Sequence, residues 1–187
     1  NSDLSVQSGT LDLATYTSNR SAAGGQLNIS GGATLIAGGA NNFPQNYAIQ
    51  TAATTSTVHY NGTVAQTVAG ITYGNLIFSY GGASAKTLNA SSTVNGDITI
   101  NIGSSVNASS YTINLGGNWS NAGTFVPATS TLVLNGISKT INGATTFNEI
   151  TVYGSYAVIN NSDITYNGLL LVTSTGIYSA GGGTATV

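Results

Sequence analysis

The amino-acid sequence predicts an all-β protein, a right-handed parallel β-solenoid of about ten short coils with no significant helix. Three observations lead to this fold class. An internal repeat relates two stretches of the chain, short apolar stretches return roughly every 17–20 residues, and only 4% of the residues are charged. No linker or change of composition divides residues 1–187, so we expect one domain. We also expect this domain to be a segment of a longer chain without caps of its own.

The internal repeat relates Ser56–Gly81 to Ser130–Gly154. Each stretch opens with Ser-Thr, continues with an apolar alternation and then reaches Asn-Gly. The offset from Ser56 to Ser130 is 74 residues, which we interpret as four coils. Further along, the apolar residues of the two stretches again correspond in order: Tyr73, Leu76 and Phe78 with Phe147, Ile150 and Val152.

The composition favours strands over helices. Hydrophobic residues make up 41% of the chain, which is enough to build a core and argues against disorder. The exposed faces of helices are usually covered by Glu, Lys and Arg, and this chain has too few of them for several helices. Its abundant Thr, Val, Ile and Tyr suit strands, and its Gly and Asn suit the turns between them.

The charge pattern excludes several classes of function. Only three residues are Lys or Arg and the net charge is −2, which leaves no basic surface for nucleic acid or for an anionic membrane. No run approaches the roughly 18 apolar residues of a membrane span, so we expect no membrane insertion. The chain has no cysteine, which rules out disulfides and thiolate metal sites.

The first part of the chain has short strands punctuated by glycine. Strands of three or four residues are predicted at Leu11–Leu13, Leu27–Ile29 and Thr34–Ile36, and Gly-Gly pairs separate them. Pro44 holds the residue before it in an extended conformation, which predicts a corner. Pro127 also lies outside the apolar alternations, where it costs no ladder hydrogen bond.

From Ser56 onward the spacing becomes regular, and one strand of each coil is expected near Val68, Leu88, Val106 and Ile141. We expect the second strand of successive coils at Leu76–Phe78, Ile98–Ile100, Thr112–Leu115, Leu132–Leu134, Ile150–Val152 and Leu169–Leu171. Asn-Gly dipeptides, which favour turns, begin at Asn61, Asn95, Asn135, Asn142 and Asn167.

Two architectures accommodate so short a repeat. In a sandwich the units are hairpins, and Asn-Gly is the usual hairpin turn. In a solenoid each unit is a coil, and equivalent residues of successive coils stack in parallel register. We favour the solenoid, because Val68 then stacks on Leu88 and Leu76 on Ile98. It also explains the low charge, since stacked like charges repel whereas stacked Asn, Ser and Thr form hydrogen bonds.

The charged residues form no recognisable catalytic set. Asp97 and Glu149 occupy equivalent places before a predicted strand, and Lys86 and Lys139 also share a repeat position. Equivalent positions three coils apart lie roughly 14 Å from each other, whereas the two carboxylates of a glycosidase lie about 5–10 Å apart. We therefore interpret these positions as solvated turns.

His59 has no other histidine and no acid near it in the sequence, so we expect a packing or surface role. No serine has the histidine and acid that a catalytic triad requires. The Gly-Gly pairs lack the aspartate of calcium-binding solenoid loops. The sequence thus predicts no catalytic residue, no metal site and no cofactor.

The aromatic residues are the one candidate for ligand contact. Tyrosine and tryptophan rings on a flat solenoid face can stack on sugars, and Trp119 is the candidate for a weak glycan contact. Against this, Tyr73 corresponds to Phe147 in the repeat, which indicates a position facing the core. The regular Thr-x-Thr ladders of flat ice-binding faces are not present in the sequence.

A series of short motifs runs in a distinctive order along nearly the whole chain. They are Gly24–Ile29, Gly31–Leu35, Phe43–Tyr47, Ser56–Gly62, Gln66–Val68, Tyr73–Leu76 and Leu115–Phe125. In this order they resemble the repeats of very large adhesin-like surface proteins of Bacteroidota-type bacteria. The resemblance implies an adhesin-type β-solenoid exported across the outer membrane, often by the type IX pathway, and it assigns no functional residue.

These expectations together predict a non-enzymatic structural or adhesive segment of a large extracellular surface protein or filament, a stiff spacer or shaft that self-associates end to end. The expected partners are neighbouring repeats of the same polypeptide, other copies of the chain and surface glycans, and the expected location is the bacterial cell surface. Two alternatives remain. One is a carbohydrate-binding module with an aromatic and Asn-rich face, and the less favoured one is a polysaccharide-active solenoid enzyme.

Overall fold

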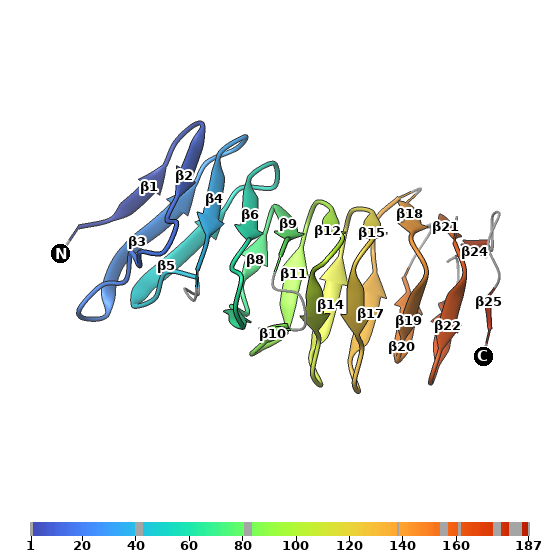
Figure 1. The fold of residues 1–187 in the computed structure, drawn as a ribbon. Helices are drawn as coiled ribbons and strands as arrows, with labels where there is room; N and C mark the ends of the chain where they lie inside the picture. The colour runs from blue at the N-terminus through green and yellow to red at the C-terminus, as the bar shows by residue number, and fades with distance from the viewer. Residues whose placement is uncertain are drawn as a thin grey trace.

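The structure, a computed structural model, describes residues 2–39, 43–80, 84–137, 139–153, 157–160, 162–173, 177–179 and 185–186. In this part of the chain the strands pair only in parallel, each with strands of the preceding and following turns. The protein is therefore a parallel β-solenoid, as the sequence predicts. Figure 1 shows the turns side by side from the N-terminus to the C-terminus, with no helix in the described residues.

One sheet, which we call the long sheet, runs through the whole described length of the solenoid. It receives one strand from each turn and has nine strands in the described residues, slightly fewer than the about ten coils expected. Its strands are β2 (Thr10–Asp12), β4 (Thr34–Ala37), β6 (Thr57–Tyr60), β9 (Asn75–Phe78), β12 (Ile98–Ile100), β15 (Trp119–Asn121), β18 (Lys139–Asn142), β21 (Ala157–Asn160) and β24 (Ile177–Ser179).

Two further faces complete the turns. The second face comprises β1 (Leu4–Val6), β3 (Gly24–Ile29) and β5 (Tyr47–Ala52), followed by β8 (Thr72–Tyr73), β11 (Ser92–Val94), β14 (Thr112–Leu115), β17 (Thr131–Leu134), β20 (Glu149–Val152) and β23 (Leu170–Val172). The third face comprises β7 (Gln66–Val68), β10 (Lys86–Leu88), β13 (Ser105–Asn107) and β16 (Thr124–Val126), followed by β19 (Thr145–Phe147), β22 (Ile164–Tyr166) and β25 (Ala185–Thr186).

The number of strands in a turn changes along the chain. The first three turns have two strands each, one in the long sheet and one on the second face, and residues 13–23 form turns and irregular segments. From β7 onward, each complete turn has three strands, one on each face. The third face therefore begins at β7, after the corner at Pro44.

The core lies between the three faces. Side chains alternate in and out along a strand, so the four-residue strands β6, β9, β14 and β17 alternate between partly exposed and buried residues. The inward side chains of successive turns stack in rows, which buries apolar surface along the whole solenoid. One such row of the long sheet contains Leu35, Val58, Leu76, Ile98, Trp119 and Ile141.

The strand register confirms the stacking that the sequence predicts. Val68 lies opposite Leu88 on the third face, and Leu76 lies opposite Ile98 in the long sheet. Both pairs are parallel and one turn apart. The alternative of a hairpin sandwich is wrong, and the Asn-Gly dipeptides turn the chain at corners between faces.

The internal repeat spans less than the four coils expected. Its two copies begin at β6 and β17, which are eleven strands apart and therefore, at three strands per turn, three and two-thirds turns. β6 belongs to the long sheet and β17 to the second face, so equivalent residues lie on different faces. An alternation of inward and outward residues is the same on every face, so the pattern does not identify the face that a strand joins.

The series of predicted second strands is mixed for the same reason. Leu76–Phe78 and Ile98–Ile100 lie in the long sheet, whereas the later members of the series, from Thr112–Leu115 onward, lie on the second face. The sequence predicts two strands in each coil, whereas each complete turn from β7 onward has three. Because the three strands have similar sequences, they were assigned to only two positions.

Candidate functional site

The two acids that the sequence aligns do not share a face. Asp97 directly precedes β12 of the long sheet, and Glu149 begins β20 of the second face. Each carboxylate contacts a polar group of an adjacent turn: Asp97 accepts a bond of 2.7 Å from the Asn118 backbone, and Glu149 accepts one of 3.0 Å from the Thr131 hydroxyl. Both acids therefore link neighbouring turns and do not form a pair.

The contact of Asp97 belongs to a line of polar side chains along one corner, which we call the corner ladder. Asn75 donates to the Ser56 carbonyl at 3.1 Å and accepts from the Asp97 backbone at 3.0 Å. In the next turns, Asn118 donates its side-chain amide to Asp97 at 3.0 Å and accepts from the backbone and hydroxyl of Thr140, both at 3.1 Å. This ladder connects five successive turns without requiring a ligand.

Lys86 and Lys139 are also separated. Lys139 begins β18 in the long sheet, whereas Lys86 begins β10 on the third face and is fully buried. The Lys86 ammonium donates to the carbonyls of Gly62 and Tyr80, both at 3.0 Å. Burial lowers the pKa of Lys86, because the core disfavours its charge. The prediction that Lys86 lies in a solvated turn is wrong, since its side chain is buried inside the solenoid and hydrogen-bonds two backbone carbonyls there.

His59 makes a contact that the sequence did not reveal. Its Nε2 lies 2.9 Å from the hydroxyl of Ser79, which also accepts a bond of 2.7 Å from the Asn101 amide. Burial lowers the pKa of His59, the charge of Asp12 raises it, and the charge of Lys86 lowers it. His59, Ser79 and Asn101 belong to three successive turns. The only feature of the sequence that could have indicated this contact is that the three residues are spaced about one coil apart.

This Ser-His contact does not make a catalytic site. A triad needs a third group that orients the histidine through its other ring nitrogen. The candidate acid, Asp12, instead accepts a bond of 2.8 Å from the Ala14 backbone. Asp12 also lies two strands away, with Ile36 between it and His59 in the ladder. The contact between His59 and Ser79 therefore has the same role as the corner ladder: it links neighbouring turns.

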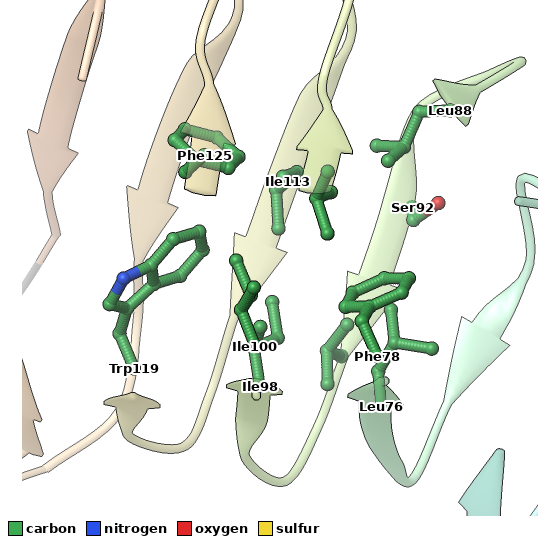
Figure 2. Close-up of a pocket in the computed structure, with 11 residues that line it drawn as sticks. Leu76, Phe78, Leu88, Ser92, Ile98, Ile100, Ile113, Trp119 and Phe125 are labelled. Atoms are coloured by element: carbon green, nitrogen blue, oxygen red, sulfur yellow. The ribbon is translucent and has the colours of Figure 1, made fainter. Parts of the chain in front are cut away.

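Trp119 lies in the core, with only 1% of its surface exposed. Its ring packs edge-on against Phe125 and Phe147, at centroid distances of 4.9 and 5.1 Å, and its Nε1 donates to the Thr145 hydroxyl at 3.3 Å. Figure 2 shows Trp119 and Phe125 directed into the space between the faces. A glycan on the surface therefore has no access to this ring.

The space in Figure 2 is a gap in core packing. Its free volume is about 10 Å³, which is about the volume that one water needs. The lining is apolar apart from Ser92, with Phe78, Ile100 and Val106 among its residues. A small-molecule site has a volume of about 300–1,000 Å³, so this gap is no ligand site.

The tyrosines divide between the core and the surface. Tyr73 and Phe147 are both buried, which confirms the core position that the repeat indicates. The hydroxyls of Tyr60 and Tyr73 lie 3.1 Å apart inside the core, and burial raises the pKa of Tyr60 to about 12. Tyr16 and Tyr80 are exposed, but they belong to turns far apart along the solenoid.

The outward rows of side chains have mixed chemistry. On the second face, one row runs through Thr72, Thr93, Asn114, Val133 and Thr151. Asn114 and Val133 therefore interrupt the row of threonines in the middle of this face. This row agrees with the absence of regular threonine ladders in the sequence.

A polar hollow lies at the corner where the third face begins, and we call it the amide hollow. It has a volume of about 340 Å³, and its lining includes the buried apolar residues Phe43 and Pro44. Its polar lining includes the side chains of Gln45 and Asn89, which are exposed and form no hydrogen bond with other described residues. The sequence showed the corner at Pro44 but not that Asn89, two turns later, lies beside it.

The described residues contain neither a cluster of metal-binding side chains nor a membrane-spanning helix. Among the side chains that the structure describes, no three of the types that bind metals lie close enough together to hold an ion. Among the described residues there is no helix with the length and apolarity that crossing a membrane requires. Comparisons with known protein families, with curated proteins and with solved structures found no match for this chain.

Proposed function

We propose that this chain is a structural, non-enzymatic segment of a large extracellular adhesin-like surface protein or filament of a bacterium, in which it serves as a stiff spacer or shaft. The observation that carries the proposal is the continuous long sheet, which joins every described turn from β2 to β24. A solenoid of this kind grows by adding turns, so its length follows from the number of repeats. Each added turn contributes about 4.8 Å.

The contacts between turns support a mechanical role. Polar side chains that carry chemistry in enzymes here bind adjacent turns, as Asp97, Glu149 and Ser79 do. Their ladders resist sliding of one turn past another, while the stacked apolar rows resist bending. The separation of Asp97 and Glu149 on different faces also supports a non-enzymatic role, because glycoside hydrolysis needs two carboxylates within about 10 Å.

The native parent polypeptide tests this proposal. An antibody against this chain would detect the parent protein on blots of native cells, fractionated into cell surface, medium and cytoplasm. We expect a polypeptide many times larger than this chain in the surface or medium fraction. A parent of about the size of this chain, or one confined to the cytoplasm, would contradict the spacer function.

A second candidate function, binding of a neutral glycan, has its support in the amide hollow. Amide groups bond sugar hydroxyls, and an apolar surface suits the C–H face of a sugar ring. The side chains of Gln45 and Asn89 are unbonded within the described residues, and Phe43 and Pro44 are apolar residues of the lining. None of the described residues that line the hollow is charged, which favours an uncharged ligand.

A glycan array with the intact chain tests this second candidate. We expect Asn89→Ala to reduce binding of any neutral glycan at least about fivefold, because it removes a hydrogen bond. Asn114→Ala is the matched control, since Asn114 is partly exposed on the second face and does not line the hollow. An array without binding, or equal loss in both variants, would contradict a glycan site here.

A further inference from the structure

The five Asn-Gly corners differ in how firmly the backbone holds the glycine. In three of them the glycine N–H donates a hydrogen bond: Gly62 to the Gln66 side chain at 2.8 Å, Gly96 to the Gly74 carbonyl at 2.8 Å, and Gly143 to the Ser162 hydroxyl at 2.7 Å. Gly136 and Gly168 donate no such bond to any described residue.

Packing separates the remaining two corners. Gly136 is buried, and a Cβ atom added to it would lie 1.9 Å from the Gly116 carbonyl oxygen. Gly168 is exposed together with Asn167, and an added Cβ would meet nothing closer than 3.0 Å. Asn167-Gly168 is therefore the one Asn-Gly corner in the described residues that combines exposure, an unbonded glycine N–H and the least tight packing of the five.

From these differences we propose that Asn167 is a site of spontaneous covalent modification, namely deamidation through a cyclic imide. The Gly168 nitrogen loses its proton to solvent and forms a bond with Cγ of Asn167, and the side-chain nitrogen leaves as ammonia. Water then opens either C–N bond of the ring and leaves aspartate or isoaspartate. The net change is one water consumed and one ammonia released, so no other reactant is needed.

The fold controls this reaction through the glycine. Glycine has no Cβ to obstruct the approach of its nitrogen to the asparagine side chain. A hydrogen bond on that nitrogen must first break, and a tightly packed corner must first open. The three bonded corners are protected by the first requirement and Gly136 by the second, whereas Gly168 has no hydrogen bond from its nitrogen to a described residue and the least tight packing of the five.

The modification has a defined structural consequence. Asn167 lies between β22 and β23, and the Leu169 carbonyl accepts a bond of 2.9 Å from the Ile150 backbone of the preceding turn. Isoaspartate at position 167 adds one carbon to the backbone just before this contact. We therefore expect the turn that contains β23 to loosen first, independently of the proposed spacer function.

Site-resolved mass spectrometry of the intact folded chain tests the inference. The chain is incubated in heavy-oxygen water at mildly alkaline pH and then digested, so that each deamidated asparagine carries the label. We expect Asn167 to react at least about fivefold faster than Asn61, Asn95 and Asn142, the factor given by one typical hydrogen bond. A rate at any of these three sites equal to that at Asn167 would overturn the proposal.

Two controls show whether the fold sets the order. In strong denaturant the Asn-Gly sites should react at similar rates, because their protection is lost; persistence of the same order there would assign it to local sequence and contradict the proposal. Gly168→Ala should slow the reaction at Asn167 clearly in the folded chain, since its Cβ hinders the approach of the attacking nitrogen. An unchanged rate in that variant would exclude the cyclic imide route.

Discussion

At the scale of the residue, the ionisable and aromatic side chains that could have formed a site lie inside the solenoid or link its turns. Lys86 is fully buried and donates to two backbone carbonyls. Trp119 is almost fully buried in an aromatic cluster with Phe125 and Phe147. These positions explain why the chain can carry such residues without forming a site: each one fills or braces the core.

The burial of Trp119 predicts a large effect on stability. Trp119→Ala should lower the free energy of unfolding by about 3–5 kcal/mol, because it removes a large buried ring and leaves a cavity. Trp119→Phe should lower the free energy of unfolding by less, because it keeps an aromatic ring, although it loses the hydrogen bond to Thr145. Denaturant unfolding followed by circular dichroism measures both. An alanine variant as stable as the original protein would contradict the core position.

The buried ammonium of Lys86 predicts a specific pH dependence. Burial lowers its pKa in the folded protein below the ordinary value of 10.5, so the unfolded chain holds its proton to higher pH. Stability must therefore rise as the pH increases from the lowered pKa towards 10.5. Lys86→Met, which keeps most of the side-chain volume, should lack this rise.

The quantity to measure is the difference in free energy of unfolding between the original protein and Lys86→Met across this range. Tyr60 and Tyr73, whose pKa values burial raises, act in the opposite direction at higher pH, but they are present in both proteins and cancel in the difference. A difference that stays constant with pH would contradict a lysine with a lowered pKa.

At the scale of the element, the corners decide how closely the turns approach. A Cβ added to Gly143 would lie 1.7 Å from the Asn121 carbonyl oxygen of the preceding turn, and Gly143 has a φ of +86°. Gly103 also has a positive φ, +75°, but an added Cβ would meet nothing within 4 Å. The same residue type therefore serves close stacking at one corner and only backbone shape at the other.

This contrast predicts unequal effects of two identical substitutions. Gly143→Ala should destabilise the protein by about 3 kcal/mol or more, because the methyl group overlaps backbone of the adjacent turn. Gly103→Ala should cost about 1–2 kcal/mol, the strain of a left-handed alanine. The midpoints of thermal or denaturant unfolding compare the two. Equal losses would show that backbone strain alone, and not the approach of the turns, determines the effect.

At the scale of the whole molecule, the long sheet continues from turn to turn. Its first described strand, β2, pairs with β4 along one edge, and its other edge, which we call the free edge, has no partner among the described strands. The Leu13 N–H donates to Ile36 and the Gly9 carbonyl accepts from Thr34, so residues 9, 11 and 13 face β4. Thr10 and Asp12 therefore direct their backbone groups away from β4, because successive residues alternate sides. Such an edge is a template for another strand.

The free edge predicts end-to-end association of isolated copies. Sedimentation at increasing concentration should show assembly of the original chain, which Thr10→Pro should weaken because proline removes an N–H from the edge. Thr10→Ala is the matched control and should assemble normally, since it keeps that N–H. A chain that stays monomeric at high concentration, or equal assembly by all three proteins, would contradict association through this edge.

The amount that could be predicted differs between fold and site. The parallel stacking of Val68 on Leu88 and of Leu76 on Ile98 was predictable, because a repeat of apolar positions along the chain reports contacts between successive turns directly. The contact of His59 with Ser79 was not predicted, although the two residues are one turn apart. Polar residues at that spacing are frequent in this chain, and only the side-chain directions distinguish those that meet.

The sequence by itself determined the all-β class and the parallel solenoid, because low charge, strand-forming residues and a short period are properties of the chain that need no coordinates. Only the tertiary structure decided how many faces a turn has, that β6 and β17 lie on different faces, and that Trp119 and Lys86 point inward. The physical reason is that strands on all three faces share one inward and outward alternation. Packing across the core, not the alternation itself, assigns each strand to its face.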